Sequence, residues 1–260
     1  SNECKIPVIT IKESRYIMDY VLIIGAKSDI AKAIAKEYAK NGYNLYLAAR
    51  NVKELEGFAS DINIKMHSKV ELIEFDILNY ENHQSFYDRL KKKPLGVISA
   101  VGYLGSQKKS QSNFFETKKI IDTNYTGIVS LFNIVANNFE ERGSGFIVGV
   151  SSVAGDRGRK SNYIYGSAKS ALSTYLSGLR NRMYHSNVHV LTVKPGFVNT
   201  KMTKNMDLPK KLTSGVECVA KAIYKSQKEK RNTLYVLSVW RWIMLFIRVI
   251  PEFIFKKMKL

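Results

Sequence analysis

Residues 20–31 read Tyr-Val-Leu-Ile-Ile-Gly-Ala-Lys-Ser-Asp-Ile-Ala, and this stretch decides the fold class. Its first five residues form an apolar run of the length of a buried strand, Gly25 permits a tight turn, and a helical pattern begins at Asp29. Exposed backbone N–H groups and the dipole of a helix that starts in this way can bind a pyrophosphate. The stretch therefore predicts the first strand, turn and helix of a nucleotide-binding α/β fold.

The same alternation of apolar and helical segments continues along the chain. Because parallel strands need crossover connections, it predicts an α/β doubly wound Rossmann fold with a seven-stranded parallel sheet and helices on both faces. The predicted strands are residues 20–24, 44–48, 70–75, 96–101, 146–150, 188–193 and 233–237. The predicted helices are residues 29–40, 52–65, 80–91, 115–139, 163–184 and 215–228.

Composition limits the class of protein. With 45% hydrophobic and 24% charged residues in a chain of 260, extended disorder is excluded, and the absence of a linker predicts one domain over residues 18–260. Residues 1–17 are expected to be an N-terminal extension outside the core. Two cysteines exclude a disulfide scaffold and suit a reducing cytoplasm, and the four histidines lie in no metal-binding pattern, so no metal site is expected.

The turn after the first strand departs from a full glycine fingerprint, because Asp29 and Ala31 stand where glycines are usual. A carboxylate at Asp29 would repel a phosphate unless it turns away or caps the helix. An ordinary capped turn is the alternative interpretation. As a cofactor site, the turn would use Gly25, Lys27, Ser28, Asp29 and Ile30.

The end of the second predicted strand indicates which dinucleotide binds. Arg50 stands where an NAD site usually presents an acidic residue, so it offers a cation to a 2′-phosphate, and Lys27 is a second candidate contact. NADP(H) is therefore favoured over NAD(H), although a solvated Arg50 is the alternative. Asp76 is predicted to accept a hydrogen bond from the adenine amino group, with Ile77 packed on the ring.

The residues that carry chemistry follow the fifth predicted strand. Tyr165 and Lys169 are four residues apart and share one face of a helix, while Ser152 lies at a strand end. Hydride reduction of a carbonyl needs a proton donor, and a phenol becomes a better one when a nearby cation lowers its pKa. Ser152 would donate a hydrogen bond to the same substrate oxygen. In the alternative, Tyr165 is a core aromatic and Lys169 a solvated charge.

Together with Asn124 in Asn-Tyr-Thr-Gly and the Pro195-Gly196 turn, this constellation resembles the short-chain dehydrogenase/reductase family over about residues 18–237. The resemblance implies sheet order 3-2-1-4-5-6-7, an NAD(P)(H) cofactor, an alcohol/ketone substrate pair and a homodimer or homotetramer. It implies Tyr165 as general acid/base, Lys169 as pKa-lowering and ribose-binding residue, and Asn124 as holder of a relay water. Further implied cofactor contacts are Ala100, Gly102, Pro195, Gly196, Val198 and Thr200.

Residues 25–31, 152–159 and 161–163 also resemble a narrower branch, the reductase partner of decaprenylphosphoryl-ribose 2′-epimerase. That resemblance implies a 2-keto furanose carried on a polyprenyl phosphate. Arg157, Arg159 and Lys160 would then meet the phosphate, or they are solvated loop cations. The alternative function is a catalytically silent NADP(H)-sensing protein, against which the intact Ser152, Tyr165 and Lys169 argue.

Residues 239–260 form an apolar and basic helical tail. Arg241 and Arg248 interrupt its apolar run, so it is too short to span a membrane, and Pro251 should end or kink the helix. It is expected to contact a membrane surface as an interfacial anchor, or else to pack on a partner subunit or over the substrate pocket. The net charge of +19 is scattered, which argues against nucleic-acid binding. We expect a cytoplasmic protein, peripheral at the inner membrane face.

Overall fold

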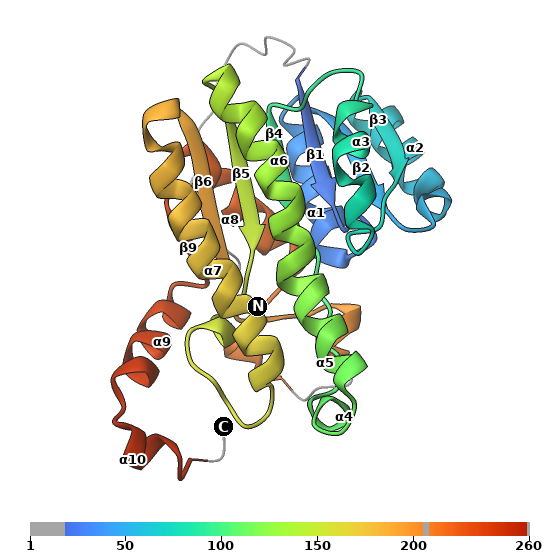
Figure 1. Ribbon diagram of the computed structural model, residues 1–260. Helices are drawn as coiled ribbons and strands as arrows, with labels where there is room; N and C mark the ends of the chain where they lie inside the picture. Colours follow the sequence, from blue (N-terminus) through green and yellow to red (C-terminus); the bar gives the residue numbers. More distant parts are fainter. Residues whose placement is uncertain (1–18, 205–207, 259–260) are drawn as a thin grey trace.

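The computed structural model describes residues 19–204 and 208–258, so the predicted extension at residues 1–17 lies outside the described residues. A seven-stranded parallel sheet forms the centre of the molecule, in the order β3-β2-β1-β4-β5-β6-β9 (Figure 1). This confirms the predicted order, because β9 is the seventh of the predicted strands. The strands are β1 (Tyr20–Ile24), β2 (Asn44–Ala49), β3 (Val70–Glu74), β4 (Gly96–Ser99), β5 (Gly145–Val150), β6 (Val188–Pro195) and β9 (Thr233–Val236).

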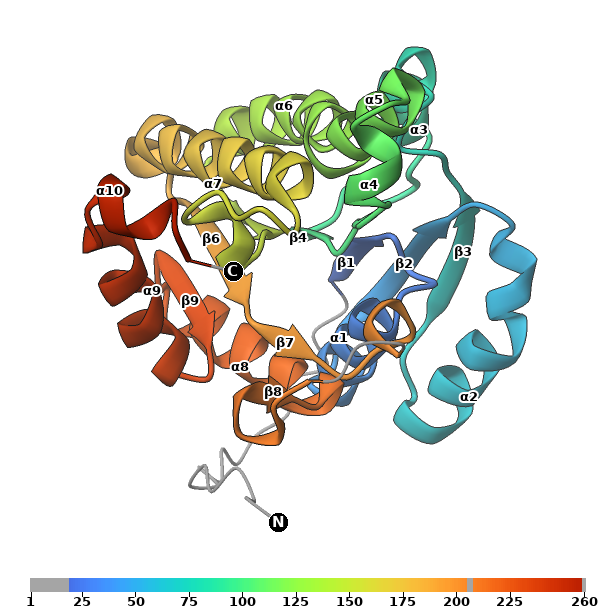
Figure 2. The ribbon, with the colours of Figure 1, turned by 90° about the horizontal axis from the view of Figure 1, so that it is seen from below.

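Helices cover both faces of the sheet, as Figure 2 shows. Successive side chains of a strand point to opposite faces, so Val21 and Ile23 contact one layer of helices while Leu22 and Ile24 contact the other. This is why the strand reads as a continuous apolar run. The first layer is α1 (Asp29–Lys40), α2 (Glu56–Met66) and α8 (Val216–Lys228), and the second is α3 (His83–Asp88), α6 (Gly127–Arg142) and α7 (Tyr163–Met183).

The element boundaries differ from the predicted ones at a few ends. The strand predicted to reach residue 101 ends at Ser99, and the helix predicted over 80–91 is a 3-10 turn, η2 (Tyr80–Asn82), followed by α3. A second 3-10 turn, η1 (Val52–Leu55), precedes α2. These differences leave the number and order of the main strands unchanged.

The helix predicted over residues 115–139 is interrupted. It consists of α5 (Phe114–Ile121), a π turn, η3 (Asp122–Thr126), and α6. In a π turn the backbone bonds run to the carbonyl five residues back, as from Gly127 N to Asp122 O, and the Asn124 side chain donates to Ile120 O, four residues back, at 2.8 Å. The π turn thereby orients the buried Asn124.

Several short elements lie at the carboxyl ends of the strands, in the lower part of Figure 1. After β6, a two-stranded parallel pair joins β7 (Phe197–Val198) to β8 (Thr213–Ser214). The other short elements at this end are η4 (Val153–Gly155), η6 (Lys201–Thr203), η7 (Lys210–Leu212) and α4 (Gln107–Ser110). The short element η5 (Tyr184–Ser186) follows α7 and directly precedes β6, so it lies at the amino ends of the strands.

The tail forms α9 (Val239–Val249) and α10 (Glu252–Phe255), and Pro251 separates them as predicted. Trp240 and Met244 are buried against Val153 and Phe197, so one face of α9 closes over the carboxyl end of the sheet. Within the described part of the chain, no helix is long and apolar enough to cross a membrane.

Candidate active site

The turn after β1 lies where the winding of the sheet reverses, since β1 pairs with both β2 and β4. Such a reversal opens a crevice at the carboxyl ends of the strands. Gly25 has φ +78°, and a Cβ there would lie 3.0 Å from Val101 N, so both conformation and space require glycine. Ser28 caps α1 by accepting a hydrogen bond from Ala31 N at 3.1 Å.

Asp29 does not cap the helix. Its carboxylate accepts a hydrogen bond from Lys201 N at 2.8 Å, which ties the start of α1 to η6, 172 residues later in the chain. The capping role considered for Asp29 is therefore wrong, and its carboxylate is bound by a neighbouring segment while the residue lines the second cavity. Ile30, the next residue, lines the crevice.

Two adjoining cavities share Lys27, Ser28, Ala100, Val101 and Gly102 in their walls. The first has a volume of about 610 Å³, and the second has a volume of about 360 Å³. Because they share a wall, the predicted phosphate turn lies between the two. This arrangement matches a dinucleotide whose two halves extend in opposite directions from its pyrophosphate.

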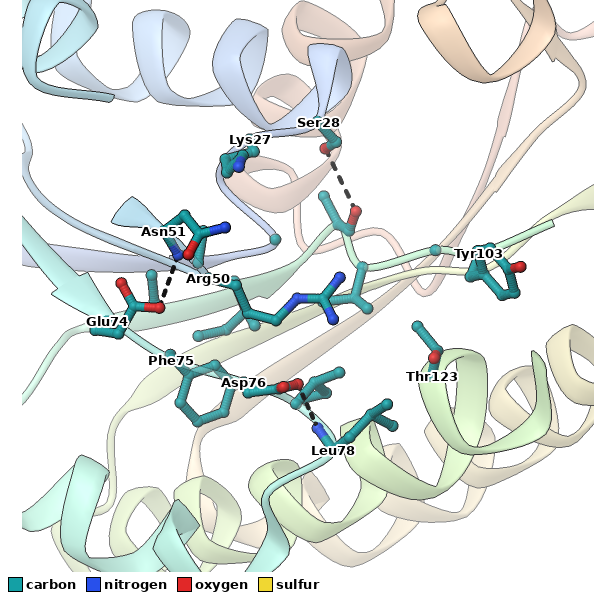
Figure 3. A pocket seen from close by; sticks show the side chains of 18 of the residues that line it. Lys27, Ser28, Arg50, Asn51, Glu74, Phe75, Asp76, Leu78, Tyr103 and Thr123 are labelled. Atoms are coloured by element: carbon teal, nitrogen blue, oxygen red, sulfur yellow. Dashed lines mark hydrogen bonds between the residues drawn. The ribbon is translucent and has the colours of Figure 1, made fainter. Parts of the chain in front are cut away.

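The first cavity gathers the residues predicted to bind the adenosine half. Arg50 is exposed and extends across the cavity, with Asp76 beside it (Figure 3). Asp76 Oδ1 accepts a hydrogen bond from Leu78 N at 3.0 Å, and Ile77 also lines the wall. Lys27 lies in the same cavity but forms an ion pair with Glu54 at 2.7 Å, which offsets part of its charge.

Sequence reasoning missed Glu74 in this cavity. Its carboxylate accepts hydrogen bonds from Asn51 N at 2.7 Å and Val52 N at 2.9 Å, and these bonds lower its pKa. They hold Asn51 at φ +52°, directly after Arg50. An acidic residue at the carboxyl end of a predicted strand, beside the cofactor turn, was the available signal.

The second cavity contains Ser152, Tyr165 and Lys169, which come from the loop after β5 and from α7. Lys169 is 2% exposed, and its Nζ donates to Val150 O at 3.0 Å and Val101 O at 3.3 Å. Its Nζ lies 5.8 Å from the centre of the Tyr165 ring. The fold therefore brings the three predicted chemical residues to one cavity.

The pKa values of this group are dominated by burial. Burial raises the pKa of Tyr165 to about 12, and a side-chain hydrogen bond with Ser152 acts in the opposite direction. Burial also lowers the pKa of Lys169 to about 7. The lowering of the phenol pKa expected from Lys169 is therefore not seen, because burial raises the pKa of Tyr165 and the opposing effect comes from Ser152.

Asn124 is fully buried beside the cavity, outside its wall. Besides binding Ile120 O, its amide donates to Tyr103 O at 2.7 Å and accepts from Tyr103 N at 3.2 Å. A Cβ on Gly102 would lie 3.7 Å from Asn124 Oδ1 and 3.9 Å from Lys169 Nζ, so these residues are neighbours. Asn124 thereby holds the loop after β4 against the lysine.

The Pro195-Gly196 turn closes the second cavity together with α9. A Cβ on Gly196 would lie 2.0 Å from Trp240 Nε1, whose N–H donates to Leu212 O at 3.1 Å. Val198 and Thr200 also line this wall. Trp240 lines the cavity as well and belongs to the tail, for which packing over the substrate pocket was one of the alternatives. Sequence reasoning missed several further lining residues, namely Leu104, Val153, Asn162, Phe197 and Met202.

The three cations of the loop before α7, Arg157, Arg159 and Lys160, have different surroundings. Arg157 points to the tail, where it donates to Ile247 O and Ile250 O, each at 2.6 Å, and pairs with Glu252 at 2.9 Å. The expectation that Arg157 meets a substrate phosphate is therefore wrong, because the end of α9 occupies its donors. Lys160 is exposed, whereas Arg159 lies in the second cavity.

Comparison with known proteins agrees with this geometry. The model of the protein family described as short chain dehydrogenase matches residues 19–211. The chain belongs to this family of oxidoreductases. An uncharacterized oxidoreductase of Mycobacterium tuberculosis is 32% identical over 241 residues, which are 92% of this chain and 96% of the relative. An uncharacterized oxidoreductase of Streptomyces coelicolor is 30% identical over 249 residues, and the match covers 92% of this chain and 95% of the relative.

Solved structures of short-chain dehydrogenases share the fold. A short-chain dehydrogenase from Sphingobium yanoikuyae in complex with NADPH has a TM-score of 0.78 at 22% identity, covering 90% of this chain and 97% of that one. The bulky-bulky ketone specific alcohol dehydrogenase from Comamonas testosteroni has a TM-score of 0.77 at 22% identity, and the match covers 90% of this chain and 96% of that enzyme. The resemblance to the short-chain dehydrogenase family is confirmed.

Proposed function

We propose that the protein transfers hydride between NADP(H) and a ketone/alcohol pair, with Tyr165 as the proton donor and acceptor. The observation that carries this proposal is the presence of Ser152, Tyr165 and Lys169 in one cavity that adjoins the glycine turn after β1. A protein that only sensed a dinucleotide would have no use for a buried phenol hydrogen-bonded to a serine.

The residues present fit a dinucleotide. Gly25 leaves the backbone open at the turn, Ser28 starts α1 with its N-terminal N–H groups, and the two cavities extend from this point. The backbone of Ala100 and Gly102 lies in both cavity walls, and Lys169 would bind the ribose beside the nicotinamide. When bound, NADPH supplies the hydride.

The protein groups handle the proton. Ser152 and Tyr165 donate hydrogen bonds to the carbonyl oxygen, which orients it and stabilises the charge that develops on it. As the carbonyl carbon receives the hydride, the phenol O–H bond breaks and its proton passes to that oxygen, giving the alcohol. The Lys169 ammonium stabilises the resulting tyrosinate, which water then reprotonates through a relay beside Asn124.

Loss of NADPH absorbance with a panel of ketones tests this assignment. Removing a general acid typically costs about 10²- to 10⁴-fold in rate, so Tyr165→Phe should reduce turnover by that factor while NADPH still binds. Tyr163→Phe, an exposed tyrosine in the same turn of α7, is the matched control and should retain activity. Full turnover in Tyr165→Phe would contradict the role. NADPH binding by wild type without reduction of any ketone would favour the sensing alternative.

The preference for NADP(H) over NAD(H) is also part of the proposal. It is supported by Arg50, which has no hydrogen bond or ion pair with another residue of the described chain, and by Lys27 across the same cavity. A 2′-phosphate would supply an anionic partner for both. Comparing NADPH and NADH affinity in Arg50→Ala tests this contact.

For the substrate we propose a lipid-linked ketone, such as a 2-keto furanose on a polyprenyl phosphate, taken from a membrane surface. The outward face of α9 and α10 supports this proposal. Trp242 is 67% exposed and Phe246 is 69% exposed, and exposed basic residues lie among them. The basic residues concerned are Arg241, Arg248, Lys256 and Lys257. Exposed apolar side chains and exposed cations on the same two helices suit an anionic bilayer.

Sedimentation with vesicles of phosphatidylglycerol and phosphatidylcholine tests the membrane contact. The double variant Trp242→Ala, Phe246→Ala should lose most binding to the anionic vesicles. The control is Tyr184→Ala, which removes an aromatic side chain that is 78% exposed and directly follows the C-terminal end of α7, away from the tail. This variant should bind the vesicles as the wild type does. Equal binding by all three proteins would contradict the contact. The homodimer or homotetramer implied by the family stays a prediction for sedimentation velocity.

A further inference from the structure

Arg159 is a cation inside the substrate cavity. Its Nη2 donates to Met244 Sδ at 3.2 Å, and its buried Nε has no hydrogen-bond partner. Burial lowers the pKa of Arg159, but a guanidinium keeps its charge at any pH at which the protein functions. A partly buried cation whose hydrogen-bond partner among the described residues is a thioether is costly unless an anion completes the site.

The carboxylates near Arg159 are occupied by other groups. Asp156 binds Lys194 Nζ at 2.5 Å and accepts a hydrogen bond from Tyr235 OH at 2.8 Å. Glu252 pairs with Arg157. Among residues 19–204 and 208–258, no carboxylate forms an ion pair with Arg159. The charge of Asp156 acts on Arg159 and opposes the effect of burial on its pKa, but Asp156 is bound to Lys194 and Tyr235 and forms no ion pair with Arg159 in the described part of the chain.

Arg159 and the chemical residues line the same cavity, which has apolar walls formed by Phe197, Met202 and Trp240. Asn162, three residues before Tyr165, adds a buried side-chain oxygen without a hydrogen-bond partner. A ligand with its carbonyl at Tyr165 can therefore reach Arg159 within one cavity. An anionic oxygen of a substrate would accept from Arg159 Nε, and a substrate hydroxyl would donate to Asn162 Oδ1.

We infer that Arg159 binds an anionic oxygen group, a phosphate ester or a carboxylate, on the ketone that this site reduces. The inference rests on the proposed reductase function and narrows its substrate class. It also separates the three cations of the loop, because Arg157 is bound to the tail and Lys160 is in solvent. Arg159 is thus the residue that determines specificity.

Equilibrium binding to the Tyr165→Phe protein saturated with NADPH tests the inference without requiring turnover. Calorimetry would compare dihydroxyacetone phosphate with dihydroxyacetone, and 4-oxopentanoate with 2-pentanone. A charge-assisted hydrogen bond corresponds to roughly ten- to hundredfold in affinity, so one anionic probe should bind at least about tenfold more tightly than its neutral partner. The pair that shows the preference identifies phosphate or carboxylate.

Substitutions then assign the preference to one side chain. In the same background, Arg159→Leu should abolish the preference by weakening the anionic probe alone, and Arg159→Lys should restore part of it. Lys160→Leu removes a cation from the same loop and should leave the preference unchanged.

Two results would overturn the inference. One is equal affinity for the charged and neutral members of both pairs. The other is an Arg159→Leu protein whose preference is unchanged, either because another group binds the anion or because both members are weakened equally, in which case Arg159 only positions Met244 and α9. A charge preference in a wild-type protein that reduces no ketone would instead contradict the proposed function alone.

Discussion

Replacing Arg50 by alanine isolates the contact that is proposed to select NADPH. Arg50 follows β2, is exposed, and extends across the first cavity without a hydrogen bond or ion pair to another described residue (Figure 3). Its removal therefore breaks no bond within the described chain. We expect the free energy of unfolding to change by less than about 0.5 kcal/mol, as for other surface substitutions.

The size of the effect follows from this exposure. A hydrogen bond to a charged group contributes about 1.5–3 kcal/mol, and solvent screening at an exposed site reduces this to roughly 1–2 kcal/mol. Arg50→Ala should therefore weaken NADPH binding by about 5- to 30-fold. NADH lacks the 2′-phosphate, so its affinity should not change. Lys27 should contribute less than Arg50, because Glu54 lies 2.7 Å from its ammonium.

Fluorescence titration of both dinucleotides into wild type and Arg50→Ala gives the ratio of affinities. Lys53→Ala is the control, since it removes an exposed cation three residues later that does not line the cavity. Added salt should weaken NADPH binding to wild type more than to Arg50→Ala. An unchanged NADPH to NADH ratio in Arg50→Ala would refute the reasoning, as would an equal loss for both dinucleotides.

Three further predictions concern stability and the tail. Gly196→Ala places a Cβ 2.0 Å from the indole nitrogen of α9, so it should destabilise the protein by about 1–3 kcal/mol in urea denaturation, whereas Gly178→Ala, with no atom within 4 Å, should not. Burial lowers the pKa of Lys169 from 10.5 to about 7, so the unfolded chain binds more protons between these values. The free energy of unfolding should rise with pH across that window, and Lys169→Met should flatten the rise. If wild type and Lys169→Met show the same pH dependence in melts, burial does not perturb Lys169. Arg157→Ala frees the carbonyls at the end of α9, so limited trypsin digestion should cleave the tail faster than in Lys160→Ala, and equal rates would show that Arg157 does not hold it.

Much of the fold follows from local patterns. The strand β1 and the helix α1 are where the apolar run and the capped turn predict them, because strand burial and helix capping depend on neighbouring residues. The spacing of Tyr165 and Lys169 likewise predicts their shared helix face. The π turn at Asn124 was not predictable, since it depends on how that helix packs against the loop after β4.

The sequence by itself determined the succession of strands and helices along the chain, the turn after the first strand and the residues proposed to move a proton. Only the tertiary structure decided what each cation does. Arg157 and Arg159 are two residues apart in one loop. Arg157 donates to the carbonyl of Ile247 in α9, which lies 90 residues later in the chain, whereas Arg159 lines the second cavity. No local pattern distinguishes them, because the partners that bury or satisfy a charged side chain are brought to it by distant parts of the chain.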